Sequence, residues 1–335
     1  MSAFNVRLEV MQTLEPRIDE YLDKFLIPPE EIWQPSDLLP DSRNENFHDE
    51  ILELRELAKD MSYDLWVTLV ADTITEEALP TYESWLVDVI GIDQQKRSES
   101  GEENGWMKWV RSWTAEENRH GDVLNKYLYL SGRINMKEVE VTTQYLIADG
   151  FDIGTGRDPY KNFIYTSFQE LATNISHKRV GQLAHKSGNH QLAKMCKIIA
   201  GDEMRHYIAY REFVKVIFEY DPSEMMKAFA DMMKRKIVMP AQFLRESGGT
   251  IGEAFVMFSN AAQNIGVYTS LDYIDILKRL INYWNVENMS GLSEQGEIAR
   301  DYLVKLPARL MRIADRMKVP DSNHRFTWVD PNGIM

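Results

Sequence analysis

Apolar residues recur with the 3.6-residue period of an amphipathic α-helix along almost the whole chain from about residue 46 to 317. Four long stretches predict the helices of a central bundle, each long enough to hold a site at mid-length. The pattern predicts four further helices that pack outside this bundle. The central helices are expected at 64–90, 104–130, 158–186 and 190–219, and the outer helices at 223–244, 252–264, 270–285 and 293–317. The sequence therefore predicts an all-α protein of about ten helices.

The two ends of the chain follow a different pattern. Residues 1–45 predict one amphipathic helix, near 8–25, and then a proline-rich arm from Ile27 to Pro40 that runs over the surface of the bundle, because proline interrupts a regular helix. The tail, 318–335, includes one extended piece at Arg325–Val329. With a core at 64–219, outer helices at 223–317 and no clear linker, we expect residues 1–335 to form a single domain.

Composition excludes several classes of protein. The formal net charge of −14 argues against nucleic-acid binding, because phosphates would be repelled. One cysteine, Cys196, cannot form an intramolecular disulfide, a Cys-rich zinc site or an iron–sulfur cluster. No apolar stretch approaches the roughly 20 residues that span a bilayer. We therefore expect a cytoplasmic protein that does not cross the membrane, or a protein of the plastid stroma if a transit peptide has been removed.

Two five-residue segments share one pattern, an acidic residue followed by Glu-x-Arg-His: they begin at Glu116 and Asp202. A Glu and a His three residues apart lie on neighbouring positions of one helix face, so both side chains can reach the same point beside the helix. Four-helix di-iron carboxylate proteins use two such Glu-x-x-His pairs and one further Glu from each of two other helices. An isolated Glu-x-x-His is more often a solvated helix face, but its duplication favours a metal site.

The two further carboxylates are expected upstream of each motif, in apolar helical stretches. Glu76 precedes the first motif and Glu170 precedes the second, so one helix pair with three ligands is present twice. Carboxylate and imidazole donors suit iron or manganese. The six predicted ligands are Glu76, Glu117, His120, Glu170, Glu203 and His206.

Neighbours of these ligands are predicted to support them. A metal-bound His usually donates its free ring N–H to a carboxylate, so we expect Asp202 beside His120 and Glu116 beside His206. His177 lies seven residues after Glu170 on the same helix face and is a further candidate for a residue that supports a metal ligand. Pro80 removes a hydrogen bond to the Glu76 carbonyl and should bend that helix near the site.

Longer segments of the chain resemble the soluble acyl-[acyl-carrier-protein] desaturases of the stearoyl type. The resemblance extends from about Trp33 to Trp328 and is carried by the segments 75–82, 113–122, 163–170 and 239–241. It implies a ferritin-like fold, a homodimer and two iron ions. It further implies O₂-dependent insertion of a cis double bond into a saturated acyl chain on acyl carrier protein, with electrons from ferredoxin. Iron would carry the chemistry, because side-chain acids and bases cannot remove hydrogen from a methylene.

The resemblance also implies roles for single residues, each with an ordinary alternative. Thr173 would deliver protons beside the metals, or is a helix hydroxyl bonded to a carbonyl. Trp33 would pass electrons through Asp202 to His120, and Trp113 lies on the same face as Glu117; the alternative is two core tryptophans. The acyl cavity would be limited by three side chains that differ from those of the plant enzymes: Trp85, Asp88 and Asn162.

Acyl carrier protein is acidic, so docking requires a local basic patch on this acidic chain. Lys227 and the run Lys234–Lys236 are one candidate cluster, although a solvated helix face is the simpler interpretation. Two rival functions remain from sequence alone. One is another ferritin-like di-metal oxidase or radical generator, and the other is a non-enzymatic iron-binding protein. The acyl chain length and the position of the double bond are not determined by the sequence.

Overall fold

The four predicted core helices are present in the computed structural model, which describes residues 3–92, 104–320 and 324–329. They are α4 (Tyr63–Glu77) with α5 (Leu79–Leu86), α6 (Gly105–Ser131), α8 (Pro159–Lys186) and α9 (His190–Tyr220). A polar side chain caps the start of each long helix by accepting a backbone N–H: Ser62, Asn104, Asp158 and Asn189. Such caps supply acceptors for N–H groups that have no partner inside the helix.

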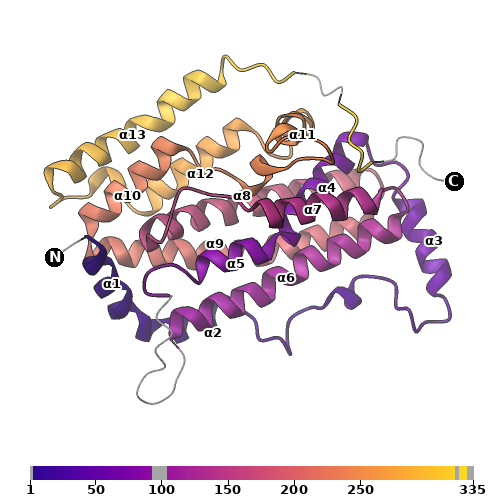
Figure 1. Ribbon diagram of the computed structural model, residues 1–335, viewed down its shortest axis with the longest axis horizontal. Coiled ribbons are helices and arrows are strands. Elements are labelled where there is room, and N and C mark those ends of the chain that lie inside the picture. The colour runs from indigo at the N-terminus through magenta and orange to yellow at the C-terminus, as the bar shows by residue number, and fades with distance from the viewer. Residues whose placement is uncertain (1–2, 93–103, 321–323, 330–335) are drawn as a thin grey trace.

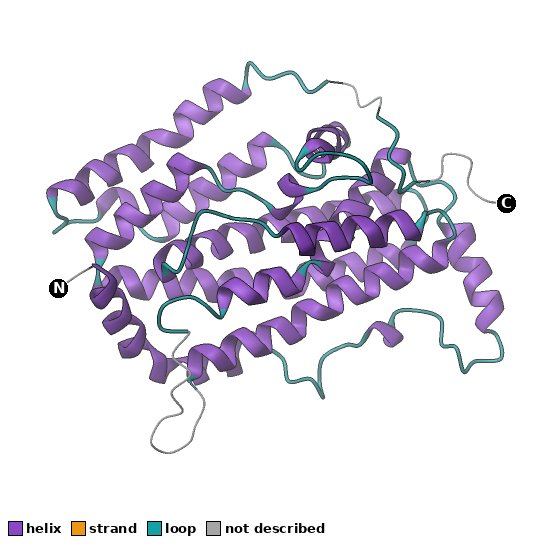
Figure 2. Cartoon of the chain, viewed as in Figure 1, coloured by secondary structure: helices purple, strands orange, loops and turns teal. Residues whose placement is uncertain are grey.

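The other helices surround this core, and the described residues form helices and loops without a strand (Figure 2). Helices α10 (Pro222–Arg235), α12 (Ser270–Tyr283) and α13 (Glu294–Ala314) pack on the α8–α9 side, as Figure 1 shows. Helices α7 (Met136–Asp149) and α11 (Glu253–Asn264) pack against α4. Short 3₁₀ turns complete the chain at Glu15–Arg17, Pro35–Asp37, Pro240–Phe243 and Val286–Asn288, labelled η1 to η4. The all-α prediction is confirmed, and no described helix has the length and hydropathy needed to cross a membrane.

Three helix predictions are corrected by the structure. The helix expected at 64–90 ends at Glu77, and α5 begins after Ala78 with Pro80 in its first turn, where a missing N–H is tolerated. The helix expected near 8–25 is α1 (Ala3–Leu14), η1 and α2 (Ile18–Phe25), since Pro16 interrupts it.

The helix expected at 223–244 ends at Arg235, because Lys236 has a positive φ of 66° that cannot continue an α-helix. Two helices were not among those predicted: α3 (Phe47–Leu57) and α7. The remaining helices agree with the predictions to within a few residues.

The arm and the tail both cross the bundle. Residues 27–40 lie along α6 and α9, where Trp33 and the backbone of Ile27 reach the interior. At the other end, Trp328 is fully buried and donates its indole N–H to Thr142, and Phe326 N donates to Tyr63 Oη. Val329 makes only an isolated bridge with Ile134, so the expected extended piece is very short. The predicted N-terminal segment, 1–45, also contains residues 1–2, and the predicted tail contains 321–323 and 330–335; these residues lie outside the part of the chain that the structure describes.

Candidate metal centre

Four helices bring the six predicted ligands to one buried place between them. Helix α6 carries Glu117 and His120, and α9 carries Glu203 and His206. Glu76 comes from α4 and Glu170 from α8, so each helix of the core contributes. Both histidines are fully buried, and the carboxylates of Glu117, Glu170 and Glu203 are nearly so.

The ligands form two overlapping groups. Within each group, one ligand atom of every residue lies within 4.8 Å of the ligand atoms of the others. The first group consists of Glu76, Glu117, His120 and Glu203, and the second consists of Glu117, Glu170, Glu203 and His206. Glu117 and Glu203 belong to both groups, which is the arrangement that two carboxylates bridging a pair of ions require. Glu76 and His120 belong only to the first group, and Glu170 and His206 belong only to the second.

Unsatisfied atoms at the centre of this cluster fit a metal pair. Nδ1 of His120, Nδ1 of His206 and Oε1 of Glu170 are buried and make no hydrogen bond of normal geometry. Buried polar atoms are normally paired, so these inward-facing lone pairs indicate a missing partner. Hard oxygen donors and imidazole nitrogens together suit iron or manganese rather than a soft metal.

The outer nitrogens of both histidines point to carboxylates. Asp202 Oδ2 lies 3.3 Å from His120 Nε2, and Glu116 Oε2 lies 2.9 Å from His206 Nε2, the two pairs that the duplication predicts. A hydrogen bond at Nε2 leaves Nδ1 as the nitrogen that faces the other ligands.

Arg205 donates hydrogen bonds to both supporting carboxylates, Glu116 and Asp202. The sequence alone did not predict this role of Arg205. Its Nη2 donates to Glu116 Oε2 at 2.8 Å and to Asp202 Oδ1 at 2.7 Å, and its Nη1 donates to the carbonyl of Phe25 at 2.6 Å. The Arg that occurs in both copies of the motif could have indicated this role. Its counterpart Arg119 behaves differently: its guanidinium lies 5.8 Å from the Trp33 ring, and its Nε and Nη2 make no hydrogen bond.

The charges of the cluster are unbalanced without a cation. Burial, reinforced by the charge of Glu203, raises the pKa of Glu76 to about 7, and burial with Glu117 and Glu203 raises the pKa of Glu170. Although burial favours its neutral acid, the nearby histidines hold the pKa of Glu117 at about 2. Although burial favours neutral imidazole, the carboxylates raise the pKa of both histidines. In the absence of metal, protons therefore supply the missing positive charge.

Several predicted neighbours also lie at the centre. His177 Nε2 is 2.8 Å from Glu76 Oε1. Thr173 Oγ1 is 2.8 Å from Glu203 Oε2 and 3.0 Å from the carbonyl of Glu170, a geometry compatible with both roles considered for it. Trp33 donates Nε1–H to Asp202 at 2.8 Å and stacks on His120 with 6.2 Å between ring centroids. The Trp113 ring lies 6.3 Å from that of His206.

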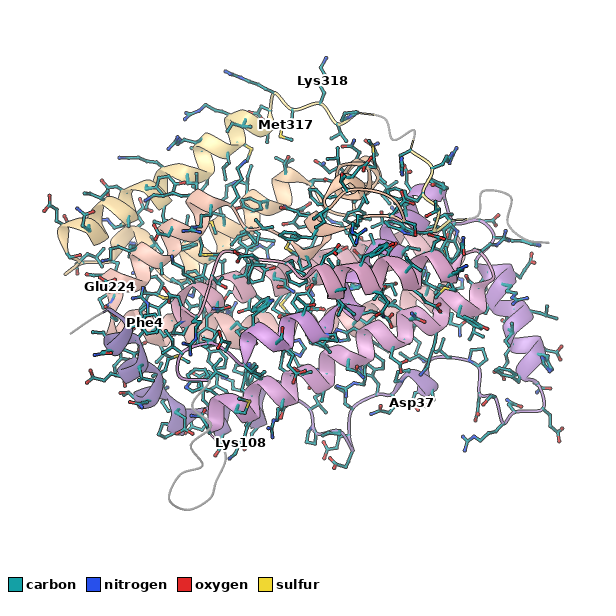
Figure 3. The ribbon with its side chains drawn as sticks, viewed as in Figure 1. Phe4, Asp37, Lys108, Glu224, Met317 and Lys318 are labelled. Atoms are coloured by element: carbon teal, nitrogen blue, oxygen red, sulfur yellow. The ribbon has the colours of Figure 1, made fainter. Side chains whose placement is uncertain are left out.

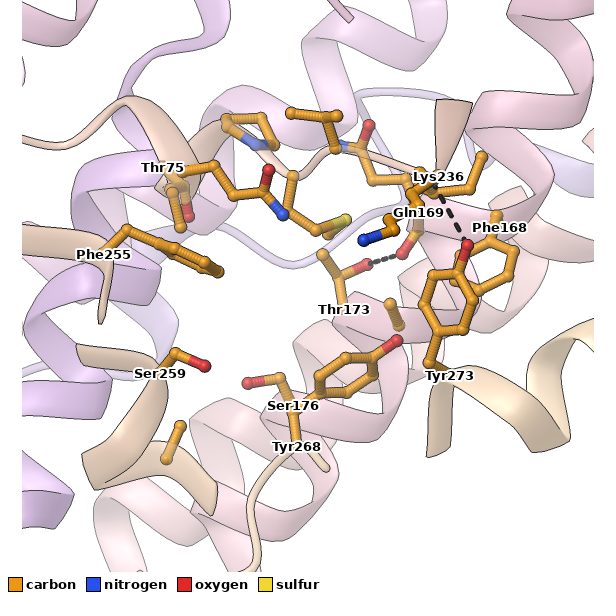
Figure 4. Close-up of a pocket in the computed structure, with 18 of the residues that line it drawn as sticks. Thr75, Phe168, Gln169, Thr173, Ser176, Lys236, Phe255, Ser259, Tyr268 and Tyr273 are labelled. Carbon is orange, nitrogen blue, oxygen red and sulfur yellow. Dashed lines mark hydrogen bonds between the residues drawn. The ribbon is translucent and has the colours of Figure 1, made fainter. Parts of the chain in front are cut away.

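A cavity of about 570 Å³ reaches this centre from the surface. Its inner end is formed by ligands and by Tyr82 and Trp113, and its walls come from α4, α8, α11, α12 and α13. Figure 4 shows Thr173, Ser176 and Tyr273 on its walls. Its lining is mainly apolar, with a few polar groups such as Gln169.

The structure does not bring the three predicted cavity residues to this lining. Asp88 is exposed beyond the end of α5. Asn162 is buried and donates its amide to the carbonyls of Gly156 and Asp158. Trp85 lies behind the cavity wall and packs its ring near Tyr82, Phe151 and Tyr165. Because α5 is separate from α4, positions after Ala78 do not continue the helix face of Glu76.

Comparison with known proteins agrees with this geometry. The profile of the fatty acid desaturase family matches residues 6–330. The chain is 49% identical over 311 residues to the chloroplastic stearoyl-[acyl-carrier-protein] 9-desaturase of Gossypium hirsutum, covering 92% of this chain and 77% of that protein. It is 46% identical over 334 residues to palmitoyl-[acyl-carrier-protein] 4-desaturase 3 of Ophrys sphegodes, covering 98% and 82%.

A solved structure shows the same fold at low sequence identity. The X-ray structure of DesA2 from Mycobacterium tuberculosis superposes with a TM-score of 0.52 and 17% identity, over 87% of this chain and 99% of that one. The family match and the two relatives cover nearly the whole chain. This protein therefore belongs to the fatty acid desaturase family, among the acyl-[acyl-carrier-protein] desaturases.

Proposed function

We propose that this protein inserts a cis double bond into a saturated acyl chain carried on acyl carrier protein. The observation that carries the proposal is the mainly apolar cavity that leads from the surface to the buried carboxylate–histidine cluster. An acyl chain in this cavity would pass beside Glu76, Glu117, Glu170 and Glu203. The relatives named above act on stearoyl and palmitoyl chains of the same carrier type.

Two iron ions are the cofactor that the ligand set supports. Glu117 and Glu203 would bridge them, with Glu76 and His120 on one side and Glu170 and His206 on the other. Bound iron supplies the redox chemistry with O₂ that removes hydrogen from an unactivated methylene. Ferredoxin is the electron donor that we propose, with the protein acting as a homodimer.

The protein's own groups would orient the chain and manage protons. Asp202, Glu116 and Arg205 fix the orientation of both imidazoles through the hydrogen bonds described above. Thr173 can hold a proton at Oγ1 between Glu203 Oε2 and the cavity that it lines. Apolar side chains such as Phe168 and Leu79 exclude water from the space beside the ligands.

Similarity to desaturases of 46–49% identity favours this function over the radical generator and the iron-binding protein that the sequence alone left open. For the compartment, both named relatives are chloroplastic. The cytoplasm and the plastid stroma both stay predictions for this chain.

The test is turnover. Iron-loaded protein is incubated in air with carrier-bound acyl chains of several lengths, ferredoxin and its reductase, and the products are analysed by mass spectrometry. A mass loss of two hydrogens in the acyl chain is expected, and Glu170→Ala should abolish it while the circular dichroism spectrum stays helical. Unchanged acyl chains at every length, with iron bound and reduced, would refute the proposal.

A further inference from the structure

The turn between α8 and α9 carries two histidines that lie outside the metal centre. His185 is in the last turn of α8, and His190 is the first residue of α9. Both side chains are exposed. Their Nδ1 atoms lie 3.0 Å apart, and their ring centroids lie 4.8 Å apart. Two imidazole nitrogens are therefore held close together at the surface of the protein.

The backbone of this turn determines the spacing of the two histidines. Gly188 ends α8 with a φ of 87°, a left-handed conformation that glycine adopts without a steric penalty. Its N–H donates to the carbonyl of His185 at 3.1 Å. The N–H of Asn189 donates to the carbonyl of Ala184 at 2.8 Å, and these two bonds form a Schellman motif. His185 and His190 thus flank a hydrogen-bonded turn rather than a free loop.

The start of α9 is also attached to its surroundings. Asn189 is fully buried, and its Nδ2 donates to Tyr127 Oη at 2.6 Å. Gln191 donates its side-chain amide to the carbonyl of Leu38 at 3.2 Å, next to Asp37 on the arm (Figure 3). A pair of ligands on such a fixed turn loses little conformational entropy when it binds an ion.

The distance between the two nitrogens matches that between two ligands of one metal ion. Only one of the two Nδ1 atoms can donate a hydrogen bond to the other, whereas a metal ion accepts a lone pair from both. At a metal–nitrogen distance of about 2.0–2.1 Å, ligands at an angle of about 90° lie about 2.9 Å apart, and ligands at the tetrahedral angle lie about 3.3 Å apart. The observed 3.0 Å is closer to the first arrangement, which is that of square-planar or tetragonal copper(II) and nickel(II).

We propose that His185 and His190 form a surface site for a divalent transition-metal ion, with copper(II) bound most tightly. Imidazole nitrogen suits copper and nickel, whereas calcium and magnesium require oxygen ligands. Copper(II) forms the most stable complexes of the divalent first-row ions with a given set of ligands. Because both histidines are exposed, water fills the remaining coordination positions. The site is distinct from the buried centre, whose two groups of candidate ligands contain neither residue.

A bound ion would join the end of α8 to the start of α9. These two helices carry three of the six candidate ligands of the buried centre: Glu170, Glu203 and His206. An ion that binds the folded protein more tightly than the unfolded chain stabilises the fold. Occupation of the surface site should therefore raise the melting temperature of the protein.

The first measurement is copper binding by protein whose buried centre already holds iron. Cu²⁺ is titrated into wild type near neutral pH, and binding is followed by calorimetry and by electron paramagnetic resonance. We expect one tightly bound ion per chain, with hyperfine coupling to two imidazole nitrogens. His185→Gln and His190→Gln should each weaken binding by roughly a hundredfold, because the remaining ligand no longer has a partner on the same turn. Iron content is measured before and after the titration, so that copper in the buried centre is not counted.

The control removes an exposed histidine outside the pair. His48 lies on α3, and its ring contacts that of Phe47. His48→Gln should leave the copper affinity within about twofold of wild type, a change too small to indicate a lost ligand. Melting curves without copper establish that all three variants are folded. Added copper should raise the melting temperature of wild type and of His48→Gln, but not that of His185→Gln or His190→Gln.

The comparison of the four proteins decides the matter. Copper binding that depends on both His185 and His190, and not on His48, would support the site. Equal copper affinity in all four proteins would overturn it, because the copper would then be an adventitious ion only. Binding that needs only one of the two histidines would also overturn the two-ligand site. None of these results depends on desaturation, which the turnover assay tests separately.

Discussion

Replacing Glu170 by Gln is expected to stabilise the metal-free protein, although Glu170 is buried at its centre. The carboxylate lies within 4.8 Å of ligand atoms of Glu117 and Glu203. Two unit charges at this distance repel by about 3 kcal/mol at an effective dielectric constant of about 20. Glu170 partly avoids this repulsion by taking up a proton, because burial and the two neighbouring carboxylates raise its pKa. Gln keeps the shape and removes the charge.

The effect depends on pH with a definite sign. A carboxyl whose pKa is higher in the folded protein than in the unfolded chain stabilises the fold at low pH, and that stabilisation is lost as pH rises through the folded pKa. The gain from Glu170→Gln should therefore be close to zero near pH 4, below the unfolded pKa of about 4.3, and should reach about 1–3 kcal/mol near pH 8. The assay is urea unfolding of chelator-treated protein at both pH values, followed by circular dichroism.

A matched change should have the opposite sign. Glu116 is also a buried Glu beside His206, but it accepts hydrogen bonds from Arg205 and from the backbone N–H of Ile27. Although burial favours its neutral acid, the pKa of Glu116 is lowered because His206 and Arg205 favour the charged form. Glu116→Gln should destabilise the metal-free protein by about 1–3 kcal/mol. The reasoning is wrong if Glu170→Gln destabilises the metal-free protein as much as Glu116→Gln does.

Three further predictions concern the centre and its surroundings. Binding of Co²⁺ to the metal-free protein should release protons, and its affinity should rise between about pH 6 and pH 8, since ligands must lose protons to bind and the pKa of Glu76 is about 7. Calorimetry in buffers of different ionisation enthalpy measures the released protons, and an affinity that does not depend on pH would contradict the prediction. Trp33→Phe keeps a ring against His120 but removes the donor to Asp202, so iron content should be unchanged while stopped-flow reduction by ferredoxin slows; an unchanged rate argues against this electron path. Trp85→Ala should lower the free energy of unfolding by roughly 3–5 kcal/mol without changing the preferred acyl length, because Trp85 lies behind the cavity lining. Turnover of acyl chains of two lengths tests this prediction. A shift of preference toward longer chains would place Trp85 at the end of the cavity.

Most of the candidate ligands could be predicted because their geometry is local. A Glu and a His three residues apart share a helix face in any α-helix, so the duplicated motif specified four of the six candidate ligands and the two supporting carboxylates. Glu76 and Glu170 followed from the symmetry of the pattern. Their actual convergence depends on how four helices pack, which the periodicity of one helix at a time does not determine.

The errors have a common physical origin in long-range geometry. The apolar pattern continues across Ala78, so the sequence predicted one helix where the chain forms two. Trp85 and Asp88, which the resemblance placed near the cavity, come after this break and do not line the cavity. Arg205 was missed because two of its three partners, Glu116 on α6 and Phe25 at the end of α2, are far away in sequence. Likewise, the part of the cavity lining that α13 contributes depends on the packing of α13 against α10 and α12.

The order in which the ribosome makes the chain separates the two halves of this enzyme. All six candidate ligands precede residue 207, so the four core helices can be complete before α10 to α13 exist. The outer wall of the cavity is synthesised afterwards, and Phe326 and Trp328 pack last, against Tyr63 at the start of α4 and Thr142 on α7. A nascent chain would thus expose its apolar cavity until these late segments close it. Premature termination near residue 220 should therefore produce an aggregation-prone bundle that already carries all six ligands.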